Sequence, residues 1–196
     1  MSFEATGREI VDSGSYMVLG TADADGRPWA SPVWYAPEGY RELFWVSSPE
    51  VRHSRNIAVR PEISIVVFDS RQPIGTGQAV YMAATAEQLT GADEERGMEI
   101  FSRRSQEQGA RPWTVDDVRP PKPIRLYRAT VTEHSMLDKS DEGPGYDHRT
   151  SVALKHVGRP LITRNLGVEA GAAPGWAVER QRAIERRQAV GEPAQS

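Results

Sequence analysis

ELFWVSSPEVRHSRNIAVRPEISIVVF, residues 42–68, is the stretch that says most about the fold of this chain. Two apolar, strand-like runs are joined here by a short polar segment, residues 47–56. Serine followed by proline is typical of a helix N-terminus, because serine caps the first amides and proline at the first helical position loses no needed hydrogen bond. We therefore predict two strands joined by a helix that begins at Ser47-Ser48-Pro49.

The polar segment also gathers side chains that suit an anion. The amide end of a helix attracts negative charge, and arginine adds a fork of charged donors that matches a phosphate group. Histidine adds a donor whose charge depends on pH. The residues concerned are Ser47, Ser48, Arg52, His53, Arg55 and Asn56. We expect them to bind a phosphorylated ligand; the alternative interpretation is a short surface helix whose arginines only face solvent.

The length and composition of the chain fit one domain with an appendage. The chain has 196 residues and a net charge of −3, which gives no overall attraction to nucleic acid or to an anionic membrane. It contains no cysteine, which removes disulfides, cysteine-based metal sites and thiol nucleophiles. The N-terminus lacks the pattern of a signal peptide, and no apolar run approaches membrane-spanning length. We expect a cytoplasmic protein that binds neither nucleic acid nor membrane.

Short strand-like runs separated by turn signals cover most of the chain up to residue 156. The expected strands lie near 16–22, 28–36, 42–47, 62–69, 78–89, 124–137 and 148–154. Asp25-Gly26 supplies the positive φ that a tight hairpin needs between the first two. Few helices accompany the strands: one near 3–13, one that starts at Asp93, and the one already described. The pattern predicts an antiparallel barrel or sandwich rather than a Rossmann-type sheet.

The second expected strand lies within RPWASPVWYA, residues 27–36. Pro32 cannot donate to a strand ladder, so we expect an edge or a bulge there, with backbone groups left free to meet a planar ring. Trp29 and Trp34 supply aromatic surface nearby, although filling the core is the alternative role for both.

Sequence motifs for nucleophilic or metal-dependent catalysis are missing. No G-x-S-x-G elbow is present, and the four histidines show no metal-ligand spacing such as H-E-x-x-H. The acidic pairs Asp23/Asp25 and Asp116/Asp117 suit turns better than a catalytic dyad. We therefore expect no metal site and assign no catalytic residue.

A fixed order of features runs through residues 10–137. A strand, a DG hairpin, a proline-interrupted aromatic strand and another strand precede the S-S-P-x-x-R-H-S-R-N segment, an apolar strand and G-T-G-Q-A-V-Y. This order resembles the pyridoxamine-phosphate-oxidase-like flavin-binding split-barrel family, in particular its actinobacterial members. The resemblance implies a mainly β, antiparallel split β-barrel of six to seven strands with a few short helices. It also implies a homodimer with two flavin mononucleotides (FMN) in grooves between the subunits.

The same resemblance implies a role for individual residues. The backbone of the second strand would face the flavin ring, the polar segment would surround the phosphate, and two further side chains would approach the ring, one of them from the partner subunit. The implied cofactor-binding residues are Trp29, Ala30, Ser31, Pro32, Val33, Ser47, Ser48, Arg52, His53, Arg55, Asn56, Gln78 and Trp113. The W-x-G-G and R-L-H-D-R motifs of true pyridoxamine phosphate oxidases are missing, so we do not expect oxidation of vitamin B6.

The function that the resemblance implies is an FMN-dependent oxidoreductase that acts on a small organic substrate by hydride transfer at flavin N5. One alternative keeps the fold and uses the deazaflavin F420, whose longer anionic tail would contact Arg27, Arg60 and the basic C-terminal part. Another is a non-catalytic protein that stores flavin or holds haem, with His53, His134 or His148 as the axial ligand.

The strand pattern fades beyond residue 156. Residues 167–175 hold few large apolar side chains, and 176–190, WAVERQRAIERRQAV, has the pattern of an amphipathic helix. We expect residues 1–156 to form the flavin-binding domain and 157–196 to form an appendage that is either mobile or docked on the partner subunit.

Overall fold

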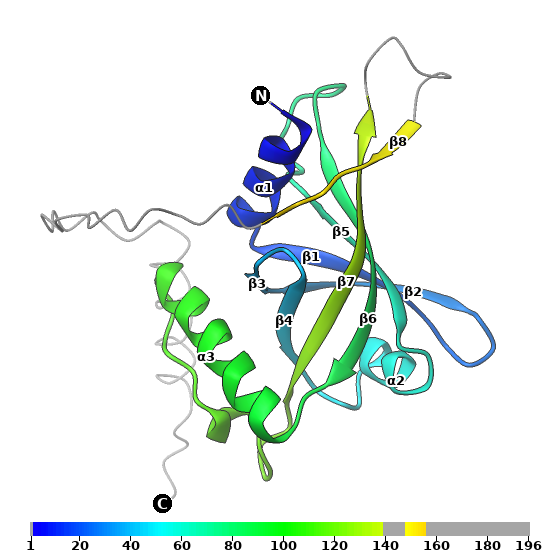
Figure 1. Cartoon of the computed structure of the whole chain (residues 1–196). Helices are drawn as coiled ribbons and strands as arrows, with labels where there is room; N and C mark the ends of the chain where they lie inside the picture. The colour runs from blue at the N-terminus through cyan, green and yellow to red at the C-terminus, as the bar shows by residue number, and fades with distance from the viewer. Residues whose placement is uncertain (1, 139–147, 156–196) are drawn as a thin grey trace, which may run out of the picture. The chain divides into compact units, whose positions relative to one another are not determined.

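The computed structural model describes residues 2–138 and 148–155 (Figure 1). Its elements, in chain order, are α1 (Phe3–Ser13), β1 (Tyr16–Ala22), β2 (Pro28–Trp34), β3 (Ala36–Glu38), β4 (Glu42–Ser47), α2 (Arg52–Val59), β5 (Glu62–Phe68), β6 (Ala79–Gln88), α3 (Gly91–Glu107), the 3-10 turn η1 (Val115–Asp117), β7 (Arg125–Asp138) and β8 (His148–Ser151). The appendage expected at 157–196 lies outside the described residues.

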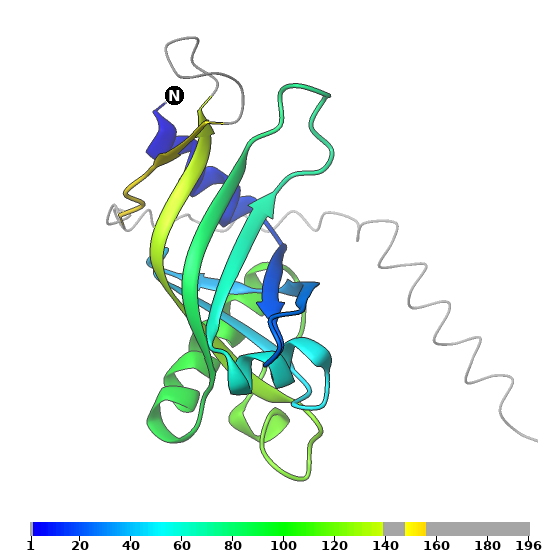
Figure 2. The ribbon, with the colours of Figure 1, turned by 90° about the vertical axis from the view of Figure 1, so that its right-hand side faces the viewer.

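The described strands form one antiparallel sheet that curls into a split barrel. Its order is β2-β1-β5-β6-β7-β4-β3, and β8 pairs with the end of β7. Figure 2 shows β1, β5, β6 and β7 side by side in a strongly bent layer. The prediction of a mainly β, antiparallel split barrel with a few short helices is therefore confirmed.

The strand expected over 28–36 is divided in two. β2 pairs with β1, whereas β3 pairs with β4, so the chain changes its neighbouring strand at Tyr35. That residue is fully buried, and its hydroxyl donates a 2.7 Å hydrogen bond to the carbonyl oxygen of Val11. The single long strand of the prediction was wrong because this tertiary contact turns the chain.

Alternating burial along β1, β5 and β6 places one face of the sheet against the core. Trp45 from β4 stacks on Tyr127 from β7 inside this core, with ring centroids 5.5 Å apart. The other face of β1, β5 and β6 carries Val18, Val66 and Tyr81, and the Arg149 guanidinium lies over the Tyr81 ring, 4.0 Å from its centroid.

A second, smaller core lies between α3 and the strands β3, β4 and β7. Phe101 of α3 forms edge-to-face contacts with Trp34, at 4.7 Å between centroids, and with Trp113, at 5.3 Å. Trp34 therefore packs against this core, which is the alternative role considered for it. Trp113 belongs to the proline-rich segment 109–123, which packs against α3.

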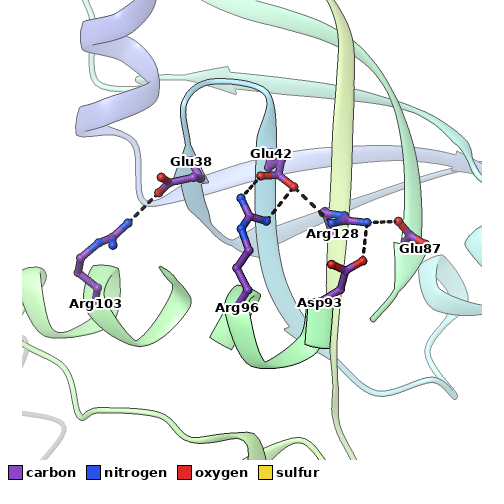
Figure 3. A network of polar contacts seen from close by, with 7 residues as sticks. All are labelled: Glu38, Glu42, Glu87, Asp93, Arg96, Arg103 and Arg128. Carbon is purple, nitrogen blue, oxygen red and sulfur yellow. Dashed lines mark hydrogen bonds and ion pairs between the residues drawn. The ribbon is translucent and has the colours of Figure 1, made fainter. Parts of the chain in front are cut away.

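Ion pairs hold α3 against the sheet (Figure 3). Glu42 of β4 forms ion pairs with Arg96 of α3 at 2.5 Å and with Arg128 of β7 at 3.3 Å. Arg128 also reaches Glu87 at 2.7 Å and Asp93 at 3.3 Å. Hydrogen bonding from Arg96 is the main cause that lowers the pKa of Glu42 below its ordinary value. The network joins one end of β6 and the start of α3 to β4 and β7.

None of the helices in the described ranges combines the length and the apolar character that crossing a bilayer requires.

Candidate functional site

Helix α2, which carries most of the predicted phosphate ligands, lies beside β1, β2 and the adjacent end of β6 (Figure 1). The helix begins at Arg52, and its N-cap residue, Val51, makes no side-chain capping bond. The predicted start at Ser47-Ser48-Pro49 was therefore wrong. Ser47 ends β4 instead, and the Ser48 hydroxyl accepts a 3.2 Å hydrogen bond from the amide of Glu50 within a turn.

His53 joins the helix to the end of β4. Its Nε2 atom lies 2.8 Å from the Ser47 hydroxyl, and only 8% of the residue is exposed. Burial lowers the pKa of the imidazole, because an apolar environment disfavours the charged form. Near neutral pH His53 is therefore mostly uncharged, and the positive charge at this site comes from the arginines.

Asn56 braces the helix from its buried face. Its Nδ2 donates to Thr21 Oγ1 at 3.0 Å, and the Thr21 hydroxyl donates in turn to the carbonyl oxygen of Trp29 at 3.3 Å. Asn56 is 3% exposed and Thr21 is 4% exposed. This chain of hydrogen bonds ties α2 to β1 and β2, so the side chain of Asn56 braces the helix.

Arg52 and Arg55 face solvent from the first turn of α2. The Arg52 guanidinium lies over the Trp29 indole, 4.5 Å from the ring centroid, and its Nη2 is 3.9 Å from Asp23 Oδ2. The side chain of Arg55 makes no hydrogen bond or ion pair with any residue that the structure describes. Two accessible guanidinium groups beside the unpaired first amides of a helix form a site that can bind a phosphate.

Strand β2 runs next to this cluster and has a free edge. It ends the sheet order and pairs with β1 along one side, where Pro32 lies opposite Val18. The predicted edge position of Pro32 is confirmed. Trp29, Ala30 and Pro32 are exposed, whereas Ser31 and Val33 are half-buried.

A shallow pocket of about 760 Å³ opens on the outer face of the sheet beside Trp29. Its floor is built from small side chains of neighbouring strands, because Ala30 pairs with Gly20 and Gly20 pairs with Ser64. A β-carbon at Gly20 would come within 2.3 Å of the Ser64 hydroxyl oxygen, so a larger residue there would displace Ser64. Trp29 lines this pocket and also lies under the guanidinium of Arg52, which is 4.5 Å from the ring centroid.

Gln78 and Trp113 lie away from this cluster within one chain. Gln78 precedes β6 at the end where Ala79 pairs with Phe68, whereas α2 adjoins the other end, where Thr85 pairs with Glu62. Six residues of extended strand separate the two ends, roughly 20 Å. The Gln78 Oε1 is buried without a hydrogen-bond partner among the described residues and borders a second pocket.

Three residues at the site were not among the predicted ligands: Gly20, Thr21 and Asp23. The first two belong to a strand whose sequence, YMVLGTA, looks like ordinary core. Asp23 was interpreted as a turn former, which it is, since its Oδ1 accepts hydrogen bonds from the amides of Asp25 and Arg27. A small residue in a buried strand, as at Gly20, was the one signal that pointed to close approach.

Comparison with solved structures shows the fold. A haem storage protein from Vibrio cholerae, HutZ, is 21% identical with a TM-score of 0.55; the alignment covers 67% of this chain and 92% of that protein. A haem-binding protein from Mycobacterium smegmatis is 20% identical with a TM-score of 0.57, covering 78% and 58%. A protein from Clostridium acetobutylicum related to general stress protein 26 of the pyridoxinephosphate oxidase family is 15% identical with a TM-score of 0.53, covering 76% and 93%.

The sequence matches no curated protein. It does match a family model, described as pyridoxamine 5'-phosphate oxidase, over residues 3–137. That range contains β1 through β6, all of β7 except its last residue, and every residue of the site described above. On this evidence the chain belongs to the pyridoxamine 5'-phosphate oxidase family.

Proposed function

We propose that this protein is a homodimeric FMN-dependent oxidoreductase that acts on a small organic substrate. The observation that carries the proposal is that the Arg52 guanidinium lies over Trp29, a residue of the edge strand β2 that also lines the shallow pocket, while Arg55 faces solvent from the same helix. The phosphate of FMN suits the guanidinium groups, and its planar ring suits the strand edge and the pocket. When bound, it supplies hydride transfer at N5.

In this proposal the protein binds and orients, and no side chain acts as a nucleophile. Arg52 and Arg55 hold the phosphate by charge-assisted hydrogen bonds. The edge strand β2, from Trp29 to Val33, would contact the ring and orient it. Asn56 and His53 keep α2 in register with β1 and β4.

The second copy of the chain would lie on the open outer face of the sheet. Register places Pro32, Val18, Val66 and Tyr81 in one row across four strands. Apolar rings continue the face, since Tyr16 is 62% exposed and Phe68 is 50% exposed. The following residues therefore form the surface that we name the outer apolar face: Tyr16, Val18, Pro32, Val66, Phe68 and Tyr81. Exposed apolar area of this kind is typical of a protein interface.

A dimer through this face also explains the separation of the predicted site residues. Gln78 lies at the far end of the β5–β6 hairpin from Arg52, so a single subunit does not bring both to one cofactor. Face-to-face packing about a two-fold axis that runs across the strands would bring the Gln78 end of one sheet toward the Trp29 end of its partner. The proposal therefore places each FMN between two subunits.

Calorimetric titration of the cofactor-free protein tests the proposal. FMN is expected to bind at micromolar or lower Kd with one site per subunit, and riboflavin, which lacks the phosphate, much more weakly. Arg52→Ala should weaken FMN binding by about 1.5–3 kcal/mol, the range for a hydrogen bond to a charged group. Arg103→Ala, on the distant helix α3, is the control. An unchanged Kd for Arg52→Ala would remove Arg52 from the site.

The same titration includes F420 and haem. Arg27 is paired with Asp25 at 2.7 Å, and Arg60 donates to the carbonyl oxygen of Ala24 at 3.2 Å, so the arginines expected to serve an F420 tail are engaged in the hairpin loop. Among the histidines in the described ranges, His53 and His134 are buried and hydrogen-bonded, while His148 is exposed. Binding of F420 or haem without FMN would replace the proposed cofactor.

A further inference from the structure

We propose that Asp23 regulates the phosphate site by holding Arg52 in a resting position and competing with the bound phosphate for its charge. This inference rests on the proposed function, because it concerns the same phosphate site. Asp23 belongs to the β1–β2 hairpin, where it stabilises the turn, and it lies outside helix α2, which carries the arginines.

The carboxylate of Asp23 is held in place by its own turn. Its Oδ1 accepts hydrogen bonds from the amide of Asp25 at 3.1 Å and from the amide of Arg27 at 2.9 Å. With that oxygen engaged, Oδ2 remains directed toward the guanidinium of Arg52, at 3.9 Å from Nη2. The side chain of Asp23 is 29% exposed and that of Arg52 is 42% exposed, so the pair lies at the surface and a ligand can reach it.

The other charged groups near Asp23 have stronger partners elsewhere. Arg27 approaches Asp23 only to 4.0 Å and pairs with Asp25 at 2.7 Å. Arg60 donates to the carbonyl oxygen of Ala24, which ties the hairpin loop to the C-terminal end of α2. The hairpin and the helix are thus held together at both ends of α2, and the carboxylate cannot easily turn away from Arg52.

Arg52 has two favourable contacts before any ligand arrives, one with the Trp29 indole at 4.5 Å and one with Asp23. A phosphate that binds Arg52 must share the guanidinium with a fixed carboxylate or draw it away. In the first case two negative groups come close together, and in the second the contact between Arg52 and Asp23 is lost. Both raise the free energy of the complex. Asp23 therefore weakens the binding of a phosphate-bearing ligand without touching the remainder of that ligand.

Asp23→Asn tests this role, because the amide oxygen still accepts the two backbone amides while the charge is lost. FMN should bind about two- to fivefold more tightly, in the range of a partly exposed charge pair, and riboflavin should bind as before. Asp25→Asn, which removes the same charge from the same loop, is the matched control. Both variants are made in an Arg27→Gln background, because loss of Asp25 would release Arg27, which lies 4.0 Å from Asp23. In an Arg52→Ala background, Asp23→Asn should have no effect.

Several results would overturn the inference: an unchanged FMN affinity in Asp23→Asn, an equal gain for riboflavin, an equal gain in Asp25→Asn, or a gain that persists without Arg52. Failure of the wild-type protein to bind FMN would instead reject the proposed function. In that event inorganic phosphate becomes the probe. Tighter phosphate binding by Asp23→Asn than by Asp25→Asn would still support the role of Asp23, and no difference between them would reject it.

Discussion

Asn56 Nδ2 and Thr21 Oγ1 are joined by a hydrogen bond of 3.0 Å between helix α2 and strand β1. This contact divides the roles of two adjacent residues. Asn56 is buried and braces the helix, whereas Arg55 is exposed and free to meet a ligand. The precision with which α2 presents its arginines thus depends on a residue that has no contact with solvent.

Asn56→Ala should lower the free energy of unfolding by about 1–3 kcal/mol, because the Thr21 hydroxyl loses its donor in a buried place. Urea unfolding followed by circular dichroism measures the change. Arg55→Ala is the control, with an expected change within about 0.5 kcal/mol for an exposed residue and a loss of FMN affinity. Equal stability of Asn56→Ala and the wild type would show that the brace contributes nothing.

Stability should fall as the pH drops from about 7 to 5. Burial is the main cause that lowers the pKa of His53 and of His134 below the ordinary value of 6.5. The unfolded chain then binds more protons than the folded one in this window, so protonation favours unfolding, and the loss is complete below the folded pKa. Urea unfolding at a series of pH values measures the slope.

His53→Gln and His134→Gln should each flatten that slope, and the double variant should remove most of it between pH 5 and 7. Carboxylates with lowered pKa values, such as Glu42, contribute only at more acidic pH. A slope that survives in the double variant would assign the effect to other groups.

Arg128→Met should destabilise the fold by about 1–3 kcal/mol. Its side chain is only 16% exposed and bridges Glu42, Glu87 and Asp93. Its removal takes one of two arginines from Glu42, which keeps Arg96, and breaks the charged hydrogen bonds to Glu87 and Asp93. Arg103→Met removes the pair with Glu38, in which 58% and 41% of the two side chains are exposed. That variant should change stability by no more than about 0.5 kcal/mol. Thermal or urea unfolding compares the two variants, and equal losses of stability would show that Arg128 contributes no more than Arg103.

Val66→Glu should convert the proposed dimer to monomer. The residue lies in the middle of the outer apolar face, between Val18 and Tyr81, where a buried charge without a partner opposes association. Sedimentation velocity measures the state of assembly, and circular dichroism checks the fold. Val59→Glu introduces the same change on α2, at a residue that is 63% exposed, and should leave the dimer intact. A Val66→Glu protein that still sediments as a dimer would place the interface elsewhere.

Sequence patterns predicted what depends on neighbours along the chain. Alternating apolar residues located most strands within one or two residues, and Gly26 adopts the positive φ, 83°, expected for the hairpin. The edge position of β2 followed from Pro32, since proline lacks a donor for the ladder. The gathering of cationic side chains near α2 was visible because the residues lie within one short segment.

What remained undetermined depends on residues far apart in the chain. Ser47 has the chemistry of a helix cap, but it ends β4 and contacts His53, because strand pairing with β7 extends through it. In the sequence, Arg55 and Asn56 suit a phosphate equally well. The structure separates them, because Thr21, 35 residues away, accepts a hydrogen bond from Asn56.

The sequence by itself determined an antiparallel β fold, an edge or a bulge at Pro32 and a cationic segment, because turn geometry, side-chain alternation and local charge act over a few residues. Only the tertiary structure decided which of those polar residues brace the fold and which face solvent, and that Asp23 stands against Arg52. The physical reason is that burial and hydrogen-bond partners are set by strands and helices that meet only after folding.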